Sequence, residues 1–106
     1  MPKYMWKVDY SVDGIRGVLK EGAAHRADFI GKLCSNLGGQ MESFHFAFGD
    51  TDVYVIAELP SDATAAAVAM AVGASGTGSI ETVKLITPEE ADAARAIETG
   101  YQAPGG

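Results

Sequence analysis

The sequence predicts an α+β fold in the order strand, helix, strand, strand, helix, strand, with one more helix at the C-terminal end. Two patterns and the chain length predict it. Residues 3–10 and 40–59 alternate apolar and polar side chains with the period of two that is typical of strands. Residues 23–37 and 63–74 space apolar or small side chains as helices do. With 106 residues, the chain suffices for one domain around one core, and we assign residues 1–106 to it.

The first strand, residues 3–10, places its large aromatic side chains on one face. Tyr4, Trp6, Val8 and Tyr10 alternate with Met5, Lys7 and Asp9, so they point to the same side. A face with three aromatic rings either packs into a core or lines a cavity.

Residues 40–59 read as a β-hairpin around the turn Phe48-Gly49-Asp50-Thr51-Asp52, because glycine and aspartate suit a tight turn. Each strand of the hairpin has an apolar face, which we expect to meet the helices. The opposite face must meet solvent, a partner or a ligand. It carries Ser43, His45, Tyr54 and Glu58.

The helices differ in the strength of their signals. Residues 14–20, with Ser11 or Asp13 as the cap, contain glycines and predict a short or broken helix. Residues 23–37 carry one apolar stripe that Phe29 and Leu33 widen, and Gly38-Gly39 ends it. The small side chains of residues 63–74 predict close approach to a sheet and cover on more than one side.

The C-terminal part of the chain begins with a glycine-rich connection over residues 73–79, followed by a strand at 80–86. Thr87-Pro88-Glu89-Glu90 is a strong helix start, and we expect the helix to reach about residue 99. Residues 102–106 should form a disordered tail.

This order of elements is the ferredoxin-like arrangement, an antiparallel four-stranded sheet with both main helices on one face. The other sheet face is then left uncovered. Burying about 500 Å² of it would contribute of order 10 kcal/mol before entropy costs, at ~25 cal/mol/Å². Two such sheets facing each other would bury it and enclose a cavity, so we expect a homodimer or a higher homo-oligomer.

Composition excludes several classes of partner and site. The net charge is −6 and no cluster of Lys and Arg is present, so nucleic acid and anionic membrane are not expected partners. No apolar run approaches the roughly 20 residues of a membrane span. One cysteine, Cys34, and two histidines are a poor zinc set, so no metal is expected. We expect a soluble, cytoplasmic protein.

Several segments together resemble the GYD-domain family of small bacterial and archaeal proteins. They are Met1-Pro2-Lys3-Tyr4, Gly38-Gly39, Phe46-Ala47-Phe48-Gly49-Asp50-x-Asp52-Val53, Ala57-x-Leu59-Pro60 and Leu85-x-Thr87-Pro88-Glu89-Glu90. The resemblance implies a dimeric α+β barrel, an architecture shared with cofactor-free monooxygenases, lactone isomerases, polyketide cyclases, haem-dependent peroxidases and ligand-sensing domains. Fold does not choose among these functions. The chain departs from the family pattern at Thr51, where a tyrosine is usual, and at His45, where an aromatic residue is common.

His45 is the main candidate for proton transfer, because an unperturbed histidine titrates near neutral pH and this one lies on the face expected to look into the barrel. Tyr54, on the paired strand, would assist together with Asp52. The alternative is a hydrogen-bonded histidine at a dimer contact. A haem-ligand role for His45 is a further alternative. Asp50 and Asp52 could share a proton or a cation, but we favour turn chemistry, in which aspartate side chains accept backbone N–H bonds.

We therefore expect a small enzyme that needs no cofactor and acts on a hydrophobic or aromatic small molecule by acid–base proton transfer, as an isomerase, cyclase or oxygenase. Its ligand-binding residues would be Trp6, Tyr4, Tyr10 and Asp50. The alternative is a non-catalytic ligand-binding or oligomerisation module.

Overall fold

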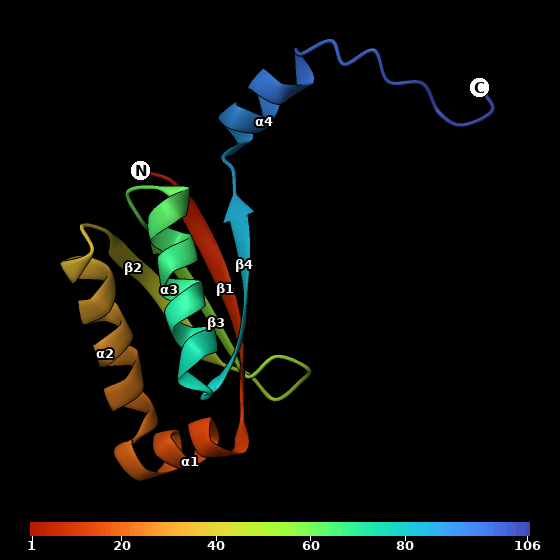
Figure 1. Cartoon of the computed structure of the whole chain (residues 1–106). Coiled ribbons are helices and arrows are strands. Elements are labelled where there is room, and N and C mark those ends of the chain that lie inside the picture. Colours follow the sequence, from red (N-terminus) through yellow and green to blue (C-terminus); the bar gives the residue numbers. More distant parts are fainter.

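A computed structural model describes residues 1–106 and confirms the α+β fold (Figure 1). The elements, in chain order, are β1 (Lys3–Tyr10), α1 (Val12–Glu21), α2 (Ala23–Asn36), β2 (Gln40–Phe46), β3 (Val53–Glu58), α3 (Asp62–Ser75), β4 (Gly78–Leu85) and α4 (Pro88–Arg95). All four strands pair antiparallel in one sheet of order β2-β3-β1-β4, which is the ferredoxin-like topology.

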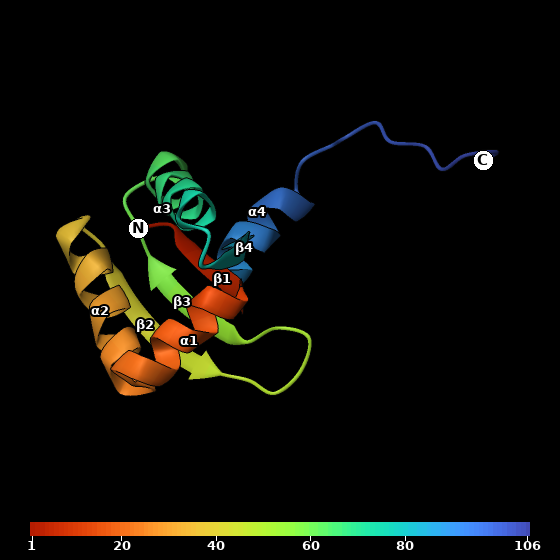
Figure 2. The same ribbon diagram turned by 60° about the horizontal axis from the view of Figure 1, so that its bottom comes forward.

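The core lies between one face of the sheet and the two helices α2 and α3 (Figure 2). Its sheet side is built by Tyr4 and Trp6 of β1 with three residues of β3, and its helix side by Cys34 of α2 with two residues of α3. The β3 and α3 residues are Val53, Val55, Ala57, Ala65 and Val68. No element of the chain covers the opposite face of the sheet, as the sequence predicts.

Strand register decides which residues share a face. Trp6 lies opposite Val55, so the aromatic side of β1 faces the helices. Tyr54 lies between Lys7 of β1 and His45 of β2, and these three residues point to the uncovered face. The expected placement of His45 and Tyr54 on one face is therefore confirmed.

Helix α1 is intact over ten residues, so the expectation of a short or broken helix was wrong. The Ser11 side chain caps it by accepting a hydrogen bond from the N–H of Gly14 (3.1 Å), and the Ser11 N–H donates to the carbonyl of Thr77 (2.9 Å). Gly14 permits this contact, because a Cβ atom at that position would collide with the same carbonyl oxygen. The cap and this tertiary contact outweigh the low helix propensity of glycine.

Helix α3 packs against the sheet on one side only. Ala65 and Val68 are buried, whereas Ala66, Met70 and Ala74 are exposed. The sequence predicted that this helix is covered on more than one side, and within this chain no second side of it is covered. The connection after α3 is also shorter than expected, because Gly78 and Ser79 already pair with the end of β1.

Helix α4 projects from the body of the molecule, and residues 96–106 continue away from it (Figure 1). It begins with the predicted capping box between Thr87 and Glu90, and every residue in it is exposed. It ends at Arg95 rather than near residue 99, because no packing surface supports a further turn. No helix in the chain is both long and apolar enough to cross a bilayer.

Candidate functional site

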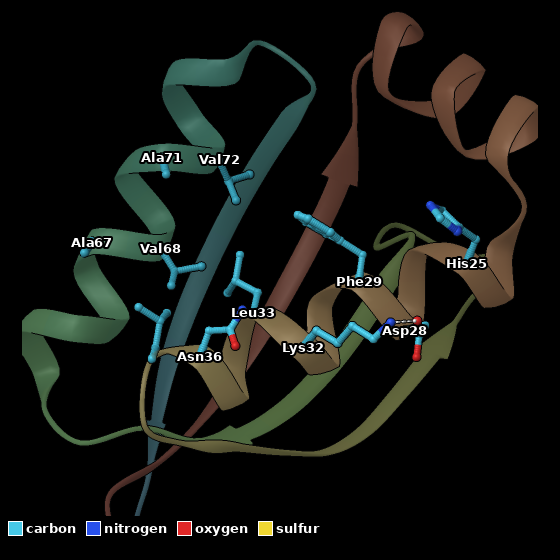
Figure 3. A pocket seen from close by; sticks show the side chains of 11 residues that line it. His25, Asp28, Phe29, Lys32, Leu33, Asn36, Ala67, Val68, Ala71 and Val72 are labelled. Carbon is cyan, nitrogen blue, oxygen red and sulfur yellow. Dashed lines mark ion pairs between the residues drawn. The ribbon is translucent and has the colours of Figure 1, made fainter.

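A cleft of about 650 Å³ lies between α2 and α3 (Figure 3). Apolar side chains form most of its walls: Phe29 and Leu33 of α2, with Leu37 just after the helix, face alanines and valines of α3. Its polar residues are His25, Asp28, Lys32 and Asn36, all on α2. Figure 3 shows Phe29, Leu33, Val68 and Val72 directed toward the space between the two helices.

The cleft exists because the apolar stripe of α2 is wider than its contact with the sheet. Cys34 is fully buried against the sheet, whereas Phe29 and Leu37 lie toward α3 and keep about 40% of their surface exposed (43% and 40%). The residues of α3 that face them include Ala67 and Ala71. These side chains are too short to fill the gap between the helices, so the surface of the cleft stays open and apolar.

A second, smaller cavity of about 40 Å³ lies beneath the cleft, between the helices and the sheet. Val68 and Val72 line both spaces, so the two are neighbours. Trp6 forms part of the floor of the inner cavity and is only 2% exposed. Its indole Nε1 is the one buried side-chain polar atom in the chain with no hydrogen-bond partner. Such a buried donor is costly to leave unpaired.

Arg26, in the first turn of α2, lies beside the inner cavity. Its guanidinium stands over the Phe29 ring, 5.2 Å from the centroid, and no carboxylate lies within 4.0 Å of it. Tyr10 lines the same cavity. Burial raises the pKa of the Tyr10 hydroxyl, and the nearby positive charge of Arg26 offsets part of that rise.

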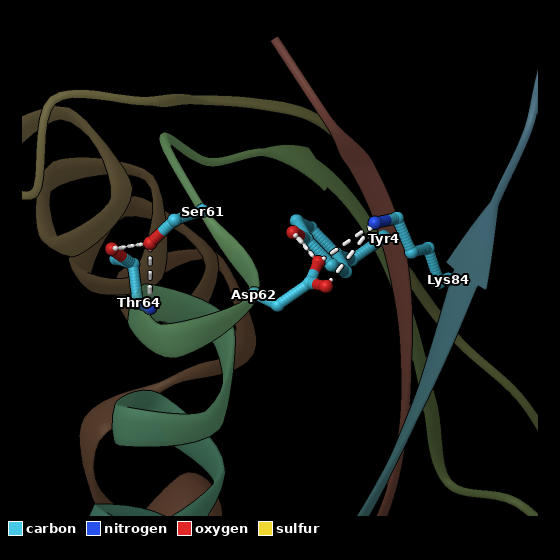
Figure 4. A network of polar contacts seen from close by, with 5 residues as sticks. All are labelled: Tyr4, Ser61, Asp62, Thr64 and Lys84. Atoms are coloured by element: carbon cyan, nitrogen blue, oxygen red, sulfur yellow. Dashed lines mark hydrogen bonds and ion pairs between the residues drawn. The ribbon is translucent and has the colours of Figure 1, made fainter.

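A polar cluster of Tyr4, Asp62 and Lys84 ties β1 and β4 to the start of α3 (Figure 4). The Tyr4 hydroxyl donates to Oδ1 of Asp62 (2.5 Å), and Nζ of Lys84 donates to both carboxylate oxygens (2.9 and 3.2 Å). Burial, followed by the bond to Asp62, raises the pKa of Tyr4 to about 12. The bonds from Tyr4 and Lys84 lower the pKa of Asp62. Both shifts move away from neutrality, so the cluster suits a structural role rather than proton transfer.

The sheet separates the sequence-predicted site residues into two groups. Tyr4, Trp6 and Tyr10 lie on the helix-covered side, whereas His45 and Tyr54 lie on the uncovered side. The expectation that all of them line one pocket is therefore wrong within a single chain, because the register places Trp6 opposite Val55 rather than opposite Tyr54. Of the predicted residues, Trp6 and Tyr10 line a cavity, and it is the inner one.

His45 and Tyr54 belong to a row of polar residues that crosses all four strands. The register aligns His45, Tyr54, Lys7 and Glu81 side by side, and Lys7 Nζ lies 3.5 Å from Glu81 Oε2. The His45 side chain is exposed and makes no hydrogen bond or ion pair within the chain. The next row, Ser43, Ile56, Met5 and Val83, is mostly apolar.

The two turn aspartates differ in their surroundings. Asp52 connects the hairpin to β1: its Oδ2 accepts the N–H of Tyr10 (2.9 Å), and its own N–H donates to the carbonyl of Val8 (3.0 Å). Asp50 is exposed and makes no side-chain hydrogen bond. The Asp52 side chain thus accepts a backbone N–H of β1 rather than one within its own turn, and Thr51 between the two aspartates is buried. No group of three or more His, Cys, Asp or Glu residues is arranged to hold a metal ion.

The residues of the cleft were missed as a site by sequence reasoning. Phe29 and Leu33 were counted as part of the apolar stripe of residues 23–37. The available signal was the mismatch between a wide stripe of large side chains on α2 and the small side chains of α3. That mismatch leaves space only if the two helices lie side by side, which the sequence pattern does not state.

Comparison with known proteins identifies the family. The family model described as the GYD domain matches residues 4–94, which is most of the chain. No curated protein and no solved structure matches the chain.

Proposed function

The chain belongs to the GYD-domain family, and we propose that it binds a hydrophobic small molecule in the cleft between α2 and α3. The observation that carries this proposal is the cleft itself. Its volume of about 650 Å³ lies within the range of small-molecule sites, ~300–1,000 Å³, and its walls combine apolar side chains with a few polar ones.

The chemistry of the walls supports binding rather than catalysis in the cleft. Its one histidine, His25, is exposed and lies 4.0 Å from Glu21, and its one carboxylate, Asp28, is exposed and forms an ion pair with Lys32 (3.0 Å). Apolar walls formed by Phe29, Leu33 and Val68 stabilise a bound hydrocarbon or aromatic body by excluding water from it.

A fluorescent apolar probe tests the proposal. 1-Aminoanthracene, which is uncharged at neutral pH, should bind saturably at one molecule per chain. Ala71→Phe places a ring in the cleft and should weaken binding at least tenfold, as steric filling of a pocket does. Ala66→Phe is the matched control, because Ala66 is exposed on the same helix and does not line the cleft. Equal binding by both variants would refute the cleft as the site.

A second candidate function is acid–base catalysis on the uncovered sheet face. It is favoured by the direct cross-strand pairing of His45 with Tyr54, with Lys7 as the next residue in the row. A second copy of the chain, stacked sheet to sheet, would cover this row and close a cavity over it. The mixture of Lys3 and Lys7 with glutamates on the same face suits such self-association.

Native mass spectrometry of the protein purified from its own host tests the two candidates together. An even-numbered oligomer with a bound mass that His45→Ala loses, and Ala71→Phe keeps, supports the sheet-face site. Bound mass lost in Ala71→Phe and kept in His45→Ala supports the cleft. A monomer in which His45→Ala changes nothing would remove the second candidate.

A further inference from the structure

The structure points to a chemical class for the ligand of the cleft. We propose that it is an elongated apolar molecule ending in a carboxylate, with its body between α2 and α3 and its carboxylate at Arg26 and Nε1 of Trp6. This inference rests on the proposed function, because it requires that the cleft binds a small molecule.

Arg26 is the cation in this chain that most lacks an anionic partner. Of the eight Lys and Arg residues, five form ion pairs with carboxylates. The three unpaired ones are Arg16, Lys20 and Arg26, and of these only Arg26 is half-buried. Arg26 also lines a separate surface recess together with Asp13 and Glu21, yet neither carboxylate lies within ion-pair distance of the Arg26 guanidinium. A partly buried guanidinium stays charged and gains most from a carboxylate that accepts two of its hydrogen bonds.

Trp6 supplies a second, independent donor at the same place. Its Nε1 is buried and unpartnered, and both Trp6 and Arg26 line the inner cavity. At about 40 Å³, this cavity has room for two or three water-sized groups, on the order of 10–15 Å³ each, but not for an aromatic ring. A carboxylate fits this space, and its oxygens would accept hydrogen bonds from both donors.

The two spaces are arranged for one ligand to reach both. Val68 and Val72 belong to the linings of both the inner cavity and the cleft, so the two spaces adjoin. The Phe29 ring lines the cleft while Arg26 stacks over it. An apolar body against Phe29 therefore places a terminal group beside the guanidinium. Tyr10, which also lines the inner cavity, adds a hydroxyl that can donate a hydrogen bond.

Decanoate and 1-decanol test the inference, because they share the apolar chain and differ in the terminal group. Both displace 1-aminoanthracene if they enter the cleft. We expect decanoate to bind at least about tenfold more tightly than 1-decanol, from charge-assisted hydrogen bonds at the end of the chain. Decanoate should also change the emission of Trp6, the only tryptophan in the sequence, more than 1-decanol does.

Two variants test whether Arg26 causes the preference for decanoate over 1-decanol. Arg26→Met keeps an unbranched stem over Phe29 and should reduce the preference for decanoate to less than about threefold, mainly by weakening decanoate binding. Lys20→Gln is the matched control: it removes an exposed, unpaired positive charge from α1, outside the linings of the cleft and the inner cavity, and should keep the preference. Equal losses in the two variants would assign the preference to overall charge and overturn the role of Arg26.

The wild-type protein alone can refute the inference, whatever the stability of the variants. If 1-decanol binds as tightly as decanoate, the carboxylate assignment is wrong and binding in the cleft still stands. If neither compound displaces the probe and the probe itself does not bind, the proposed function fails as well.

Discussion

Gly14 and Gly17 lie on the same helix, α1, yet replacing each with alanine should change stability in opposite directions. A Cβ atom at Gly17 meets no atom within 4 Å. Gly17→Ala should therefore stabilise the protein by about 0.5–1 kcal/mol through helix propensity alone. A Cβ atom at Gly14 would collide with the Thr77 carbonyl and would lie 3.1 Å from the Tyr10 ring.

The size of the effect at Gly14 follows from the contacts that the collision would break. Ser11 donates from its N–H to the Thr77 carbonyl (2.9 Å) and from its hydroxyl to the Gly76 carbonyl (2.8 Å). Losing two such bonds costs about 1–3 kcal/mol at roughly 0.5–1.5 kcal/mol each. Because the propensity gain is the same in both variants, the difference between them should equal this cost. For a domain of this size, each kcal/mol shifts the Tm by about 4–8 °C.

Urea unfolding at pH 7, followed by Trp6 emission, measures both variants, because the buried indole reports on the core between sheet and helices. If Gly14→Ala proves as stable as Gly17→Ala, the close approach of α1 to Thr77 is wrong. The contact also matters for the proposed carboxylate end of the ligand site, since Gly14 lines one recess together with Tyr10 and Arg26. Gly14→Ala should therefore weaken decanoate binding, whereas Gly17→Ala should weaken it less, even though Gly17 lines the same recess.

Four further predictions concern the rest of the chain. Spectrophotometric titration should show one of the four tyrosines ionising near pH 12, and Tyr4→Phe should remove that step, since the pKa of Tyr4 is raised to about 12. The pKa of Asp62 is lowered below 3.8 in the fold. Its stabilising contribution is therefore present above pH 3.8 and disappears as the pH falls through the lowered value. The stability deficit of Tyr4→Phe, measured by urea unfolding, should accordingly shrink from pH 7 to pH 2.5. Cys34 is fully buried and burial raises its pKa, so a thiol reagent at pH 8 should label it only at the rate of unfolding, and rapid labelling of the folded protein would contradict this placement. A chain ending at Ile86 should have the same free energy of unfolding in urea as the full chain within about 0.5 kcal/mol, because residues 87–106 are exposed throughout. A larger loss would show that α4 supports the fold.

Much of the fold could be predicted because strand and helix patterns in this sequence are strong and agree with each other. The alternation of the hairpin placed His45 and Tyr54 on one face, and the register confirms it. The stripe of α2 placed Cys34 inside the core. Predictions failed where packing overrode local propensity, as in α1, whose glycines weaken an isolated helix but allow its contact with Thr77.

The candidate site could be predicted only in part, because it depends on how separate elements lie in space. Trp6 was identified as a residue of a core or a cavity wall, and it is both. Its grouping with His45 failed because alternation tells which residues share a face and leaves open which face the helices cover. Arg26 gave no signal at all, since its lack of a carboxylate partner is a property of its surroundings.

The sequence by itself determined the order of the elements, the two faces of each strand, the capping box of α4 and the family, because these depend on neighbours within a few residues. Only the tertiary structure decided the rest: that the aromatic face of β1 is covered, and that α2 and α3 leave a cleft above an unpaired Trp6 Nε1 and Arg26. The physical reason is that a cleft is space left by the packing of elements distant in the chain. Its volume depends on their separation and on the size of the facing side chains, neither of which a periodicity records.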